Sequence, residues 1–335
     1  METGISTIII RAFRDQDYAG IVELSNAVYE DYPWSEAEFR HWDERYDGQR
    51  VKLERIVADD SSGRMLGWAE YHHDPSGYHP QKLFIDITVH PDQQNRGTGS
   101  RLYTELLARL APLDPITLWA NTRETFDRAV RFLERRGFAE KRRAWESRLN
   151  VAAFDPAPFL EKAARGVQDL QITTAAEERE KDPEWMQKLY DLDLEVGEDV
   201  PRVDAYTPQP LEQHMKRLLD NPDWLSDAHF LAKDGERYVA ESNMFRSDQL
   251  PDVLYQGITG TRRAYRGRGV ALALKLRTVE YAQGHGCREI RTWNDTLNAP
   301  MLHINVKLGF VRQPAWITFE RVHDQHGEQA TDGVR

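Results

Sequence analysis

Two glycine-rich loops carry the residue types needed to bind a phosphate-bearing ligand. The first reads Gln94-Asn95-Arg96-Gly97-Thr98-Gly99, and the second reads Arg266-Gly267-Arg268-Gly269-Val270-Ala271. Each loop follows an apolar, strand-like run, residues 83–89 or 253–259, and precedes a stretch with helical apolar periodicity. A Gly-Phe pair follows at the same spacing in both cases, Gly137-Phe138 after Gly97 and Gly309-Phe310 after Gly269. The sequence therefore contains an internal repeat.

Such a loop is suited to hold an anion at the start of a helix. The first N–H groups of a helix lack an intrahelical partner, and the helix dipole adds positive charge there. Glycine permits close backbone approach, and Arg96, Arg266 and Arg268 supply charge-assisted contacts. Neither loop is a P-loop or a dinucleotide-binding Gly-x-Gly-x-x-Gly motif. The alternative is an ordinary helix start with a glycine-rich turn, which the repetition of the loop disfavours.

The pattern Gln/Arg-x-x-Gly-x-Gly/Ala resembles the pyrophosphate loop of the GCN5-related N-acetyltransferase (GNAT) family. The resemblance covers both halves of the chain and implies two tandem GNAT domains with acetyl-coenzyme A (acetyl-CoA) as co-substrate. It also implies that the strand before each loop contacts the pantetheine arm. The implied cofactor-binding residues are Ile87, Thr88, Val89, Gln94, Asn95, Arg96, Gly97, Thr98, Gly99, Ser100, Ile258, Thr259, Gly260, Arg266, Gly267, Arg268, Gly269, Val270, Ala271, Asn294 and Asn298.

The periodicity of the remaining sequence predicts an α/β fold with a mixed sheet in each half. Residues 1–151 and 168–323 are the two predicted domains, joined by a helix-prone connection at 152–167 that we expect to pack on one of them. A polar tail follows at 324–335. The predicted strands are 7–13, 51–58, 65–72, 83–89, 116–120, 142–151, 170–173, 228–233, 238–245, 253–259, 290–293 and 316–322; the main helices are 36–45, 100–110, 125–135, 184–194, 211–219, 270–283 and 300–308.

Composition limits the classes of partner. The 335-residue chain has a net charge of −11, which argues against nucleic acid or an anionic membrane as the main partner. No apolar run reaches membrane-spanning length, and the single cysteine, Cys287, cannot form an intramolecular disulfide. We expect a cytoplasmic monomer or homodimer, without a bound metal, that acts on a small-molecule or peptide amine.

Transfer of an acetyl group to an amine needs a group that removes the amine proton. Glu70 and Glu241 are the candidate general bases, because each is a central acid in an apolar strand beside the strand that feeds a loop. The alternative for each is a solvent-facing glutamate. We expect Asp86 to be structural.

Many GNAT members place a tyrosine four residues before the Gly-Phe pair, where it protonates the leaving thiolate. This chain has Leu133 and Asn305 at those positions. Asn305 can hydrogen-bond but cannot act as an acid. It is the third candidate catalytic residue, and with Asn294 and Asn298 it resembles a subgroup motif. The rival interpretation is therefore a catalytically weak or inactive acyl-CoA-binding sensor or scaffold on the same fold.

Tandem members of the family, such as mycothiol synthase, often keep one catalytic half. The acidic run at residues 191–199 favours the second half slightly, because it offers charge to a cationic amine. A solvated helix face is an equally good interpretation of that run.

Overall fold

The computed structural model describes residues 7–323, which form two compact units. Within the described residues, unit 1 comprises 7–30, 46–141 and 317–323, and unit 2 comprises Asp31–Arg45 and Arg142–Trp316. The tail predicted at residues 324–335 lies outside the described residues. The boundaries predicted at 151 and 168 mark the sequence repeat, whereas the compact units combine segments from both halves.

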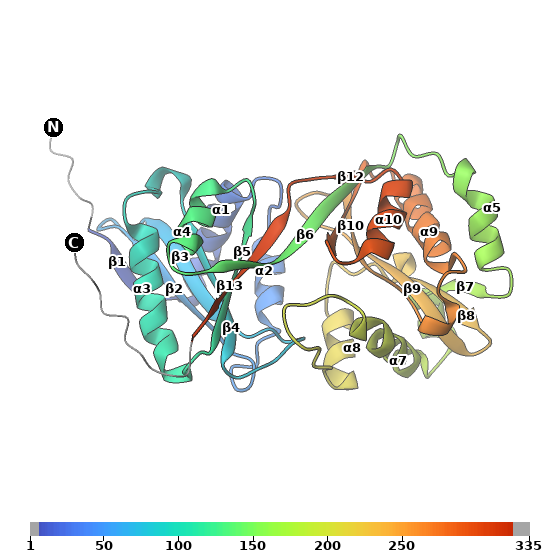
Figure 1. Cartoon of the computed structure of the whole chain (residues 1–335), viewed down its shortest axis with the longest axis horizontal. Helices are drawn as coiled ribbons and strands as arrows, with labels where there is room; N and C mark the ends of the chain where they lie inside the picture. The colour runs from blue at the N-terminus through green and yellow to red at the C-terminus, as the bar shows by residue number, and fades with distance from the viewer. Residues whose placement is uncertain (1–6, 324–335) are drawn as a thin grey trace. The chain divides into compact units, whose positions relative to one another are not determined.

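Unit 1 contains a mixed sheet on which the first glycine loop is built (Figure 1). Strands β4 and β5 of this unit pair in parallel, whereas the pairs β1–β2, β2–β3 and β3–β4 are antiparallel. The strand order is β1 (Ile9–Ala12), β2 (Leu53–Asp59), β3 (Met65–His72), β4 (Lys82–Val89), β5 (Thr117–Arg123) and β13 (Trp316–Val322).

Helices cover both faces of this sheet: α1 (Tyr18–Val28) and α3 (Thr98–Leu110) lie on opposite sides (Figure 1). The stripe of leucines on α3, which includes Leu102 and Leu106, shares a core with Leu83 and Ile85 of β4. Because side chains alternate along a strand, the even-numbered residues of β4 face the side of α1. The remaining helices of this unit are α4 (Asp127–Glu134), η1 (Asp15–Asp17), η2 (Pro91–Gln93) and η3 (Ala111–Leu113).

Unit 2 repeats this plan around a second mixed sheet. Leu231 and Ala232 are neighbours on β8, yet they belong to different apolar clusters, one beneath α7 and α8 and the other beneath α9. Helices therefore cover both faces here as well. The strand order is β6 (Ala139–Asn150), β11 (Glu289–Asp295), β10 (Val253–Thr261), β9 (Arg237–Phe245), β8 (Phe230–Asp234) and β7 (Gln171–Thr174), with β12 (Val311–Arg312) paired to β6.

The helices of unit 2 include elements that have no predicted counterpart, such as α6 and the two 3₁₀ turns. They are α2 (Glu36–Asp43), α5 (Ala157–Gly166), α6 (Ala175–Lys181), α7 (Trp185–Glu198), α8 (Leu211–Leu219), α9 (Val270–Gly284), α10 (Ala299–Lys307), η4 (Ser226–Ala228) and η5 (Arg263–Tyr265). No helix within residues 7–323 is long and apolar enough to cross a bilayer. The cytoplasmic location stays a prediction.

The last strand of the chain completes the sheet of unit 1 beside β5. The hydroxyl of Thr318 on β13 lies 2.7 Å from Oδ1 of Asn121, and Nε1 of Trp119 lies 3.1 Å from Oε1 of Glu320. In turn, the strand that ends the first half, β6, pairs with β11 of unit 2 from Ala144 to Asn150. The strand at 316–322 was expected to close the sheet of its own half.

Candidate active site

The first glycine loop forms a tight link between β4 and α3. Gly97 caps the helix with a φ of 89°, and Asn95 also has a positive φ of 62°. The N–H of Arg101 makes the first helical bond, to the carbonyl oxygen of Gly97 at 3.0 Å. The preceding amides of α3 therefore point out of the helix end, where they favour an anion.

Strand β4 separates from its parallel neighbour next to this loop. Lys82–Phe84 pair with Thr117–Trp119 of β5. Beyond Phe84, β4 continues as far as Val89 in register with β3, whereas its pairing with β5 ends at Phe84. The backbone of β4 is thereby left with one edge open toward the loop, as the family resemblance predicts.

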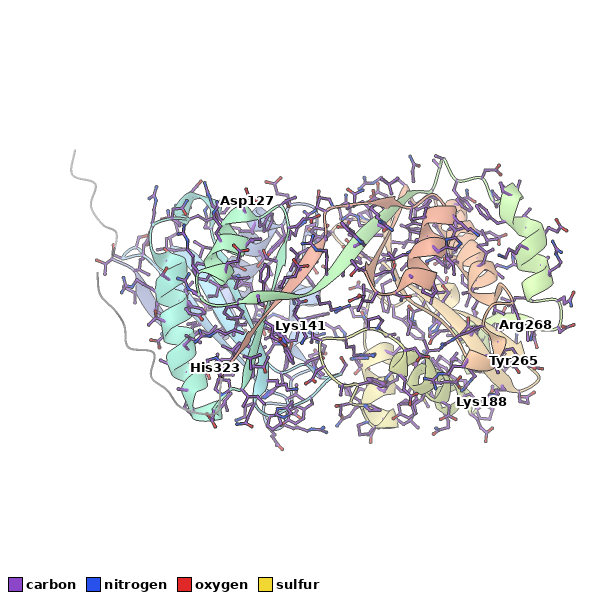
Figure 2. The ribbon with its side chains drawn as sticks, in the orientation of Figure 1. Asp127, Lys141, Lys188, Tyr265, Arg268 and His323 are labelled. Atoms are coloured by element: carbon purple, nitrogen blue, oxygen red, sulfur yellow. The ribbon has the colours of Figure 1, made fainter. Side chains whose placement is uncertain are left out.

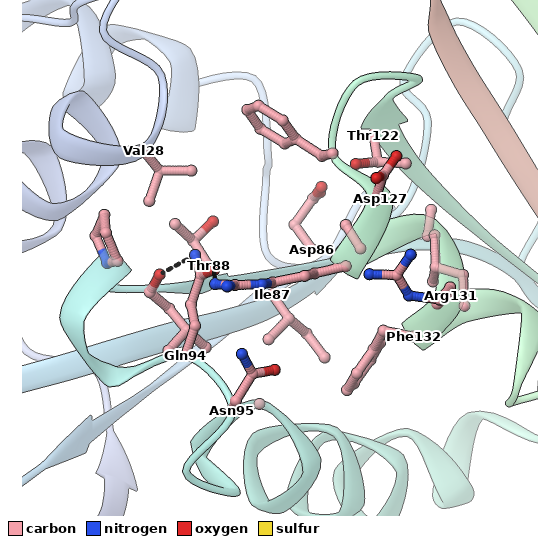
Figure 3. Close-up of a pocket in the computed structure, with 18 of the residues that line it drawn as sticks. Val28, Asp86, Ile87, Thr88, Gln94, Asn95, Thr122, Asp127, Arg131 and Phe132 are labelled. Atoms are coloured by element: carbon pink, nitrogen blue, oxygen red, sulfur yellow. Dashed lines mark hydrogen bonds between the residues drawn. The ribbon is translucent and has the colours of Figure 1, made fainter.

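A cavity of about 600 Å³ opens at this separation (Figure 3). It brings together the end of α1, the separated part of β4, the glycine loop, the end of β5 and α4. All the first-half residues predicted to bind the cofactor line it except Arg96 and Thr98. The lining residues that we use below are Tyr29, Asp86, Ile87, Thr88, Val89, Gln94, Asn95, Gly97, Gly99, Ser100, Phe126, Asp127, Arg128, Arg131 and Leu133.

Asp86 lines the cavity and is paired with a histidine on the neighbouring strand. The Nε2 atom of His72 lies 3.3 Å from Oδ2 of Asp86, and the imidazole stacks on Phe84 at 5.4 Å between ring centroids. Burial alone lowers the pKa of His72, but the hydrogen bond to Asp86 and the charges of Glu70 and Asp86 outweigh it. The pKa of His72 is therefore raised, which favours the protonated ring.

Glu70, a predicted general base, is the neighbour of this pair on β3, and its carboxylate is bound by an arginine. Nε of Arg55 donates to Oε2 of Glu70 at 2.6 Å, and a second guanidinium nitrogen lies 2.5 Å from the same oxygen. Burial raises the pKa of Glu70, and the Arg55 charge opposes that rise. Glu70, His72 and Asp86 place one ligand atom each within 4.8 Å. Because Arg55 holds one of them, we keep the prediction that no metal is bound.

Tyr29 supplies a phenol to the cavity from the end of α1. Its ring centroid lies 5.5 Å from that of Phe126. Burial raises the pKa of Tyr29, and the nearby charge of Asp86 raises it further. The cavity therefore contains a protonated tyrosine although Leu133, which also lines it, occupies the usual tyrosine position.

Arginines give the mouth of the cavity a positive charge. Arg128 of α4 reaches toward the loop, and its guanidinium donates to Oε1 of Gln94 at 3.1 Å, drawn as a dashed line in Figure 3. Arg131 also lines the cavity. Arg136 donates to the hydroxyl of Ser100 at 2.9 Å. These groups surround the loop amides with donors suited to phosphate.

The second glycine loop has the same backbone plan. Gly269 caps α9 with a φ of 100°. The parallel pairing of β10 with β11 ends at Tyr255, although β10 continues to Thr261. The predicted residues from Arg266 to Ala271 lie together at the start of α9, and Ile258, Thr259 and Gly260 precede them on β10. Their contacts with a cofactor stay a prediction.

The three asparagines of unit 2 make contacts within the protein. Asn305 is 1% exposed, and its Nδ2 donates to Oδ1 of Asn294 at 2.6 Å. Asn298 caps α10 by accepting from the N–H of Met301 at 3.3 Å. These bonds fix the end of β11 against α10. The catalytic role predicted for Asn305 and the cofactor contacts predicted for the other two are not tested by them.

Glu241, the other predicted base, is fully buried in unit 2. Its Oε2 accepts from Nε2 of His229 at 3.1 Å, and Nδ1 of that ring accepts from Nε1 of Trp224 at 3.3 Å. Burial lowers the pKa of His229 to about 4, so this histidine is neutral. Burial and the Asp193 charge raise the pKa of Glu241 well above its usual value. Asp193 is itself bound to His214, with its Oδ2 2.6 Å from Nε2 of the imidazole.

The two glutamates do not occupy equivalent places in the repeat. Glu70 pairs across the sheet with Asp86, whereas Glu241 pairs with Gly260. When the two capping glycines are aligned, the counterpart of Gly260 is Thr88, whose partner on β3 is Trp68. A β-bulge between Gln256 and Thr259 shifts the register of the second half. Sequence reasoning could not detect this shift, because a bulge leaves no clear compositional signal.

Sequence reasoning also missed two residues that line the cavity, Tyr29 and Asp86, and the histidine that binds Asp86. Asp86 was expected to be structural, and neither Tyr29 nor His72 was a candidate. One signal was available: Asp86 interrupts an apolar strand directly before a glycine loop, on the face opposite to Leu83 and Ile85. An acid placed there faces whatever fills the gap beside β4.

Comparisons with known proteins agree with this architecture. The acetyltransferase (GNAT) family model matches residues 18–138 and 198–310. Mycothiol acetyltransferase of Acidothermus cellulolyticus is 24% identical over 301 residues, covering 85% of this chain and 84% of that protein. The protein of the same name from Actinosynnema mirum is 23% identical, covering 77% of this chain and 81% of its own.

Solved structures show the same tandem fold. A tandem GNAT protein from the clavulanic acid biosynthesis pathway, without acetyl-CoA, has a TM-score of 0.74 at 18% identity and covers 94% of this chain and 98% of its own. A GCN5-related N-acetyltransferase from Sphaerobacter thermophilus has a TM-score of 0.67 at 20% identity and covers 94% of this chain and 95% of its own. The chain belongs to the GNAT family of acetyltransferases and is an acyltransferase with two GNAT regions.

Proposed function

We propose that this protein transfers an acetyl group from acetyl-CoA to a primary amine in the cavity of unit 1. The observation that carries the proposal is the joint lining of one cavity by the glycine loop, the open edge of β4 and the Asp86 carboxylate. Proximity of the thioester and the amine in such a cavity supplies a large part of the rate enhancement.

The first loop is the proposed cradle for the cofactor phosphates. The free amides that follow Gly97 and the guanidinium of Arg128 are donors on adjacent sides of the cavity. The open edge of β4 from Ile87 to Val89 offers backbone groups to the pantetheine arm, in the manner of strand addition. A Cβ built on Gly97 would meet nothing within 4 Å, so the loop has room for a ligand.

Asp86 is the proposed general base. The amine nitrogen attacks the thioester carbon, a C–N bond forms, and Asp86 accepts the proton that the nitrogen must lose. His72 acts as a positioning residue, because its bond to Oδ2 leaves the other carboxylate oxygen for the amine. Glu70 holds Arg55 and adds to the field that keeps His72 protonated.

Tyr29 is the proposed proton donor to the leaving thiolate. As the C–S bond breaks, the phenol gives its proton to sulfur and then regains one from Asp86. A primary ammonium must lose two protons. The first leaves to solvent before the amine attacks, and the second passes through Asp86 and Tyr29 to the thiol, so the transfer balances. Asp86 becomes neutral when it accepts the amine proton, which removes the charge that opposes ionisation of Tyr29.

The acceptor is a cationic amine in solution, carried by a small molecule or a peptide. Asp86 places negative charge on the cavity wall at β4, which suits a positively charged group there. A thiol-release assay with acetyl-CoA and a panel of primary amines tests the proposal. Absence of turnover with every amine, despite binding, would favour the rival acyl-CoA-binding scaffold, which the loss of a tyrosine at Leu133 supports.

A further inference from the structure

The second glycine loop is in contact with carboxylates from the end of α7. Asp199 caps that helix, and its Oδ2 lies 2.5 Å from a guanidinium nitrogen of Arg266. Arg263 donates to both oxygens of Asp199, at 2.9 and 3.2 Å, and to Glu198 at 3.0 Å. The acidic run that sequence reasoning assigned to a cationic substrate thus binds the chain's own arginines.

Glu195, one turn earlier on α7, strengthens this attachment. Its Oε1 accepts from the backbone N–H of Arg263 at 2.9 Å, and its Oε2 accepts from Nη1 of Arg262 at 2.6 Å. Arg268, which packs over the Tyr265 ring (Figure 2), lies 3.6 Å from the Asp169 carboxylate. The cations around the second loop are therefore matched by carboxylates of the same unit.

Equivalent positions in the two halves show what these contacts replace. With Gly97 aligned to Gly269, Arg266 is the counterpart of Gln94, which lines the cavity of unit 1. In the same alignment Gly260 is the counterpart of Thr88, another lining residue. A Cβ built on Gly260 would lie 2.1 Å from Cγ1 of Val196, so α7 packs directly on the face of β10 that corresponds to the face of Thr88 in unit 1.

The glycine that starts each helix shows the same contrast. A Cβ built on Gly97 meets nothing within 4 Å, whereas one built on Gly269 lies 3.4 Å from the carbonyl oxygen of Lys162. Helix α5 supplies Lys162 and also Gly166, whose own Cβ would lie 2.9 Å from the carbonyl oxygen of Arg268. The connection between the halves therefore covers the start of α9.

We propose that the second loop is a closed copy of the cofactor cradle, held shut by the carboxylates and Val196 of α7, so that each chain binds one acyl-CoA. The carboxylates take the contacts that a phosphate would take, and Val196 takes the space beside the strand. This inference rests on the proposed function of unit 1, because it names the half that receives the cofactor.

Titration calorimetry of the full chain with acetyl-CoA tests the closed cradle. We expect one site in the wild type, one site in Arg266→Ala, and none in Gly97→Asp. Aspartate tolerates a positive φ and adds a charge that repels phosphate. Gly63→Asp is the matched control, since Gly63 has a φ of 87° and an equally open position. Two sites in the wild type, or loss of binding in Arg266→Ala alone, would overturn the inference.

A second variant asks whether the cradle can be opened. In Val196→Ala/Asp199→Asn we expect a second binding event, which Arg266→Ala then removes. Asp191→Asn is the control for charge, because Asp191 is exposed and binds Gln187 at 2.8 Å. A folded double variant that still binds one equivalent would contradict the role of α7. No binding by any form would instead refute the proposed function.

Discussion

The Nε2 atom of His72 lies 3.3 Å from the Oδ2 atom of Asp86, across the β3–β4 pair and at the wall of the unit 1 cavity. The two residues are not directly opposite each other, because Glu70 faces Asp86 and His72 faces Phe84 in the register. The contact is therefore diagonal, a geometry that long side chains can span. The hydrogen bond joins Asp86, the cavity-lining carboxylate of β4, to His72, whose imidazole lies outside the cavity.

His72→Gln should lower kcat and change the dependence of stability on pH. The pKa of His72 is raised above 6.5, so its contribution to the free energy of unfolding is complete below pH 6.5 and is lost as the pH rises through the raised value. Urea unfolding at about pH 6 and about pH 9 should show a smaller pH effect in the variant. An identical pH effect in both proteins would show that the pair is not charged.

Tyr29→Phe should lower kcat by ~10-fold or more while the Kd for acetyl-CoA stays within ~3-fold, since only the donor hydroxyl is lost. The ring that contacts Phe126 is retained in this variant. Tyr29→Leu removes the ring as well and serves as the comparison. Normal turnover in Tyr29→Phe together with failure of Tyr29→Leu would mean that Tyr29 only packs.

Glu241→Gln separates the two candidate sites. If Glu241 were the base, the variant would lose activity. We expect unchanged turnover, because Gln is neutral like the protonated acid and its amide oxygen can still accept from Nε2 of His229. The pKa of Glu241 is raised, so wild-type stability falls as the pH rises above 4.5, and the variant should lack that fall. A large drop in kcat would move the chemistry to unit 2.

Lys275→Met should stabilise the protein near neutral pH. Lys275 is 1% exposed, its ammonium donates to Oε1 of Gln256 at 3.2 Å, and burial lowers its pKa from 10.5 to about 7. Wild-type stability should therefore rise from about pH 7 toward pH 10 as the unfolded state releases its proton. Chemical unfolding should show a gain of ~2–4 kcal/mol at pH 7 in the variant. A loss of stability would contradict the buried-charge explanation.

The repeat, the two loops and most elements were predictable because they depend on local patterns. Strand 65–72 and helix 211–219 were predicted with the bounds that the structure shows. Gly97 and Gly269 were identified because a helix start after a strand needs a residue that tolerates positive φ.

The assignment of segments to units was not predictable. Residues 31–45 belong to unit 2, where Asp31 binds Arg148 at 3.2 Å and the Tyr32 ring lies 6.2 Å from that of Trp293. Periodicity describes which face of an element is apolar, but not which sheet it joins. The roles of Asp86 and Val196 were not predictable for the same reason, because they depend on which elements pack beside β4 and β10.

Turnover of Asp86→Asn is the measurement that tests the central claim most directly. Thiol release from acetyl-CoA with a reactive amine should fall ~10²-fold or more in kcat, while the Kd for acetyl-CoA changes less than ~3-fold, because the amide keeps the shape but cannot accept the proton. Asp92→Asn, at a side chain that is 76% exposed near the same loop, should match the wild type. Full turnover in Asp86→Asn would contradict the assignment of the chemistry to the cavity of unit 1.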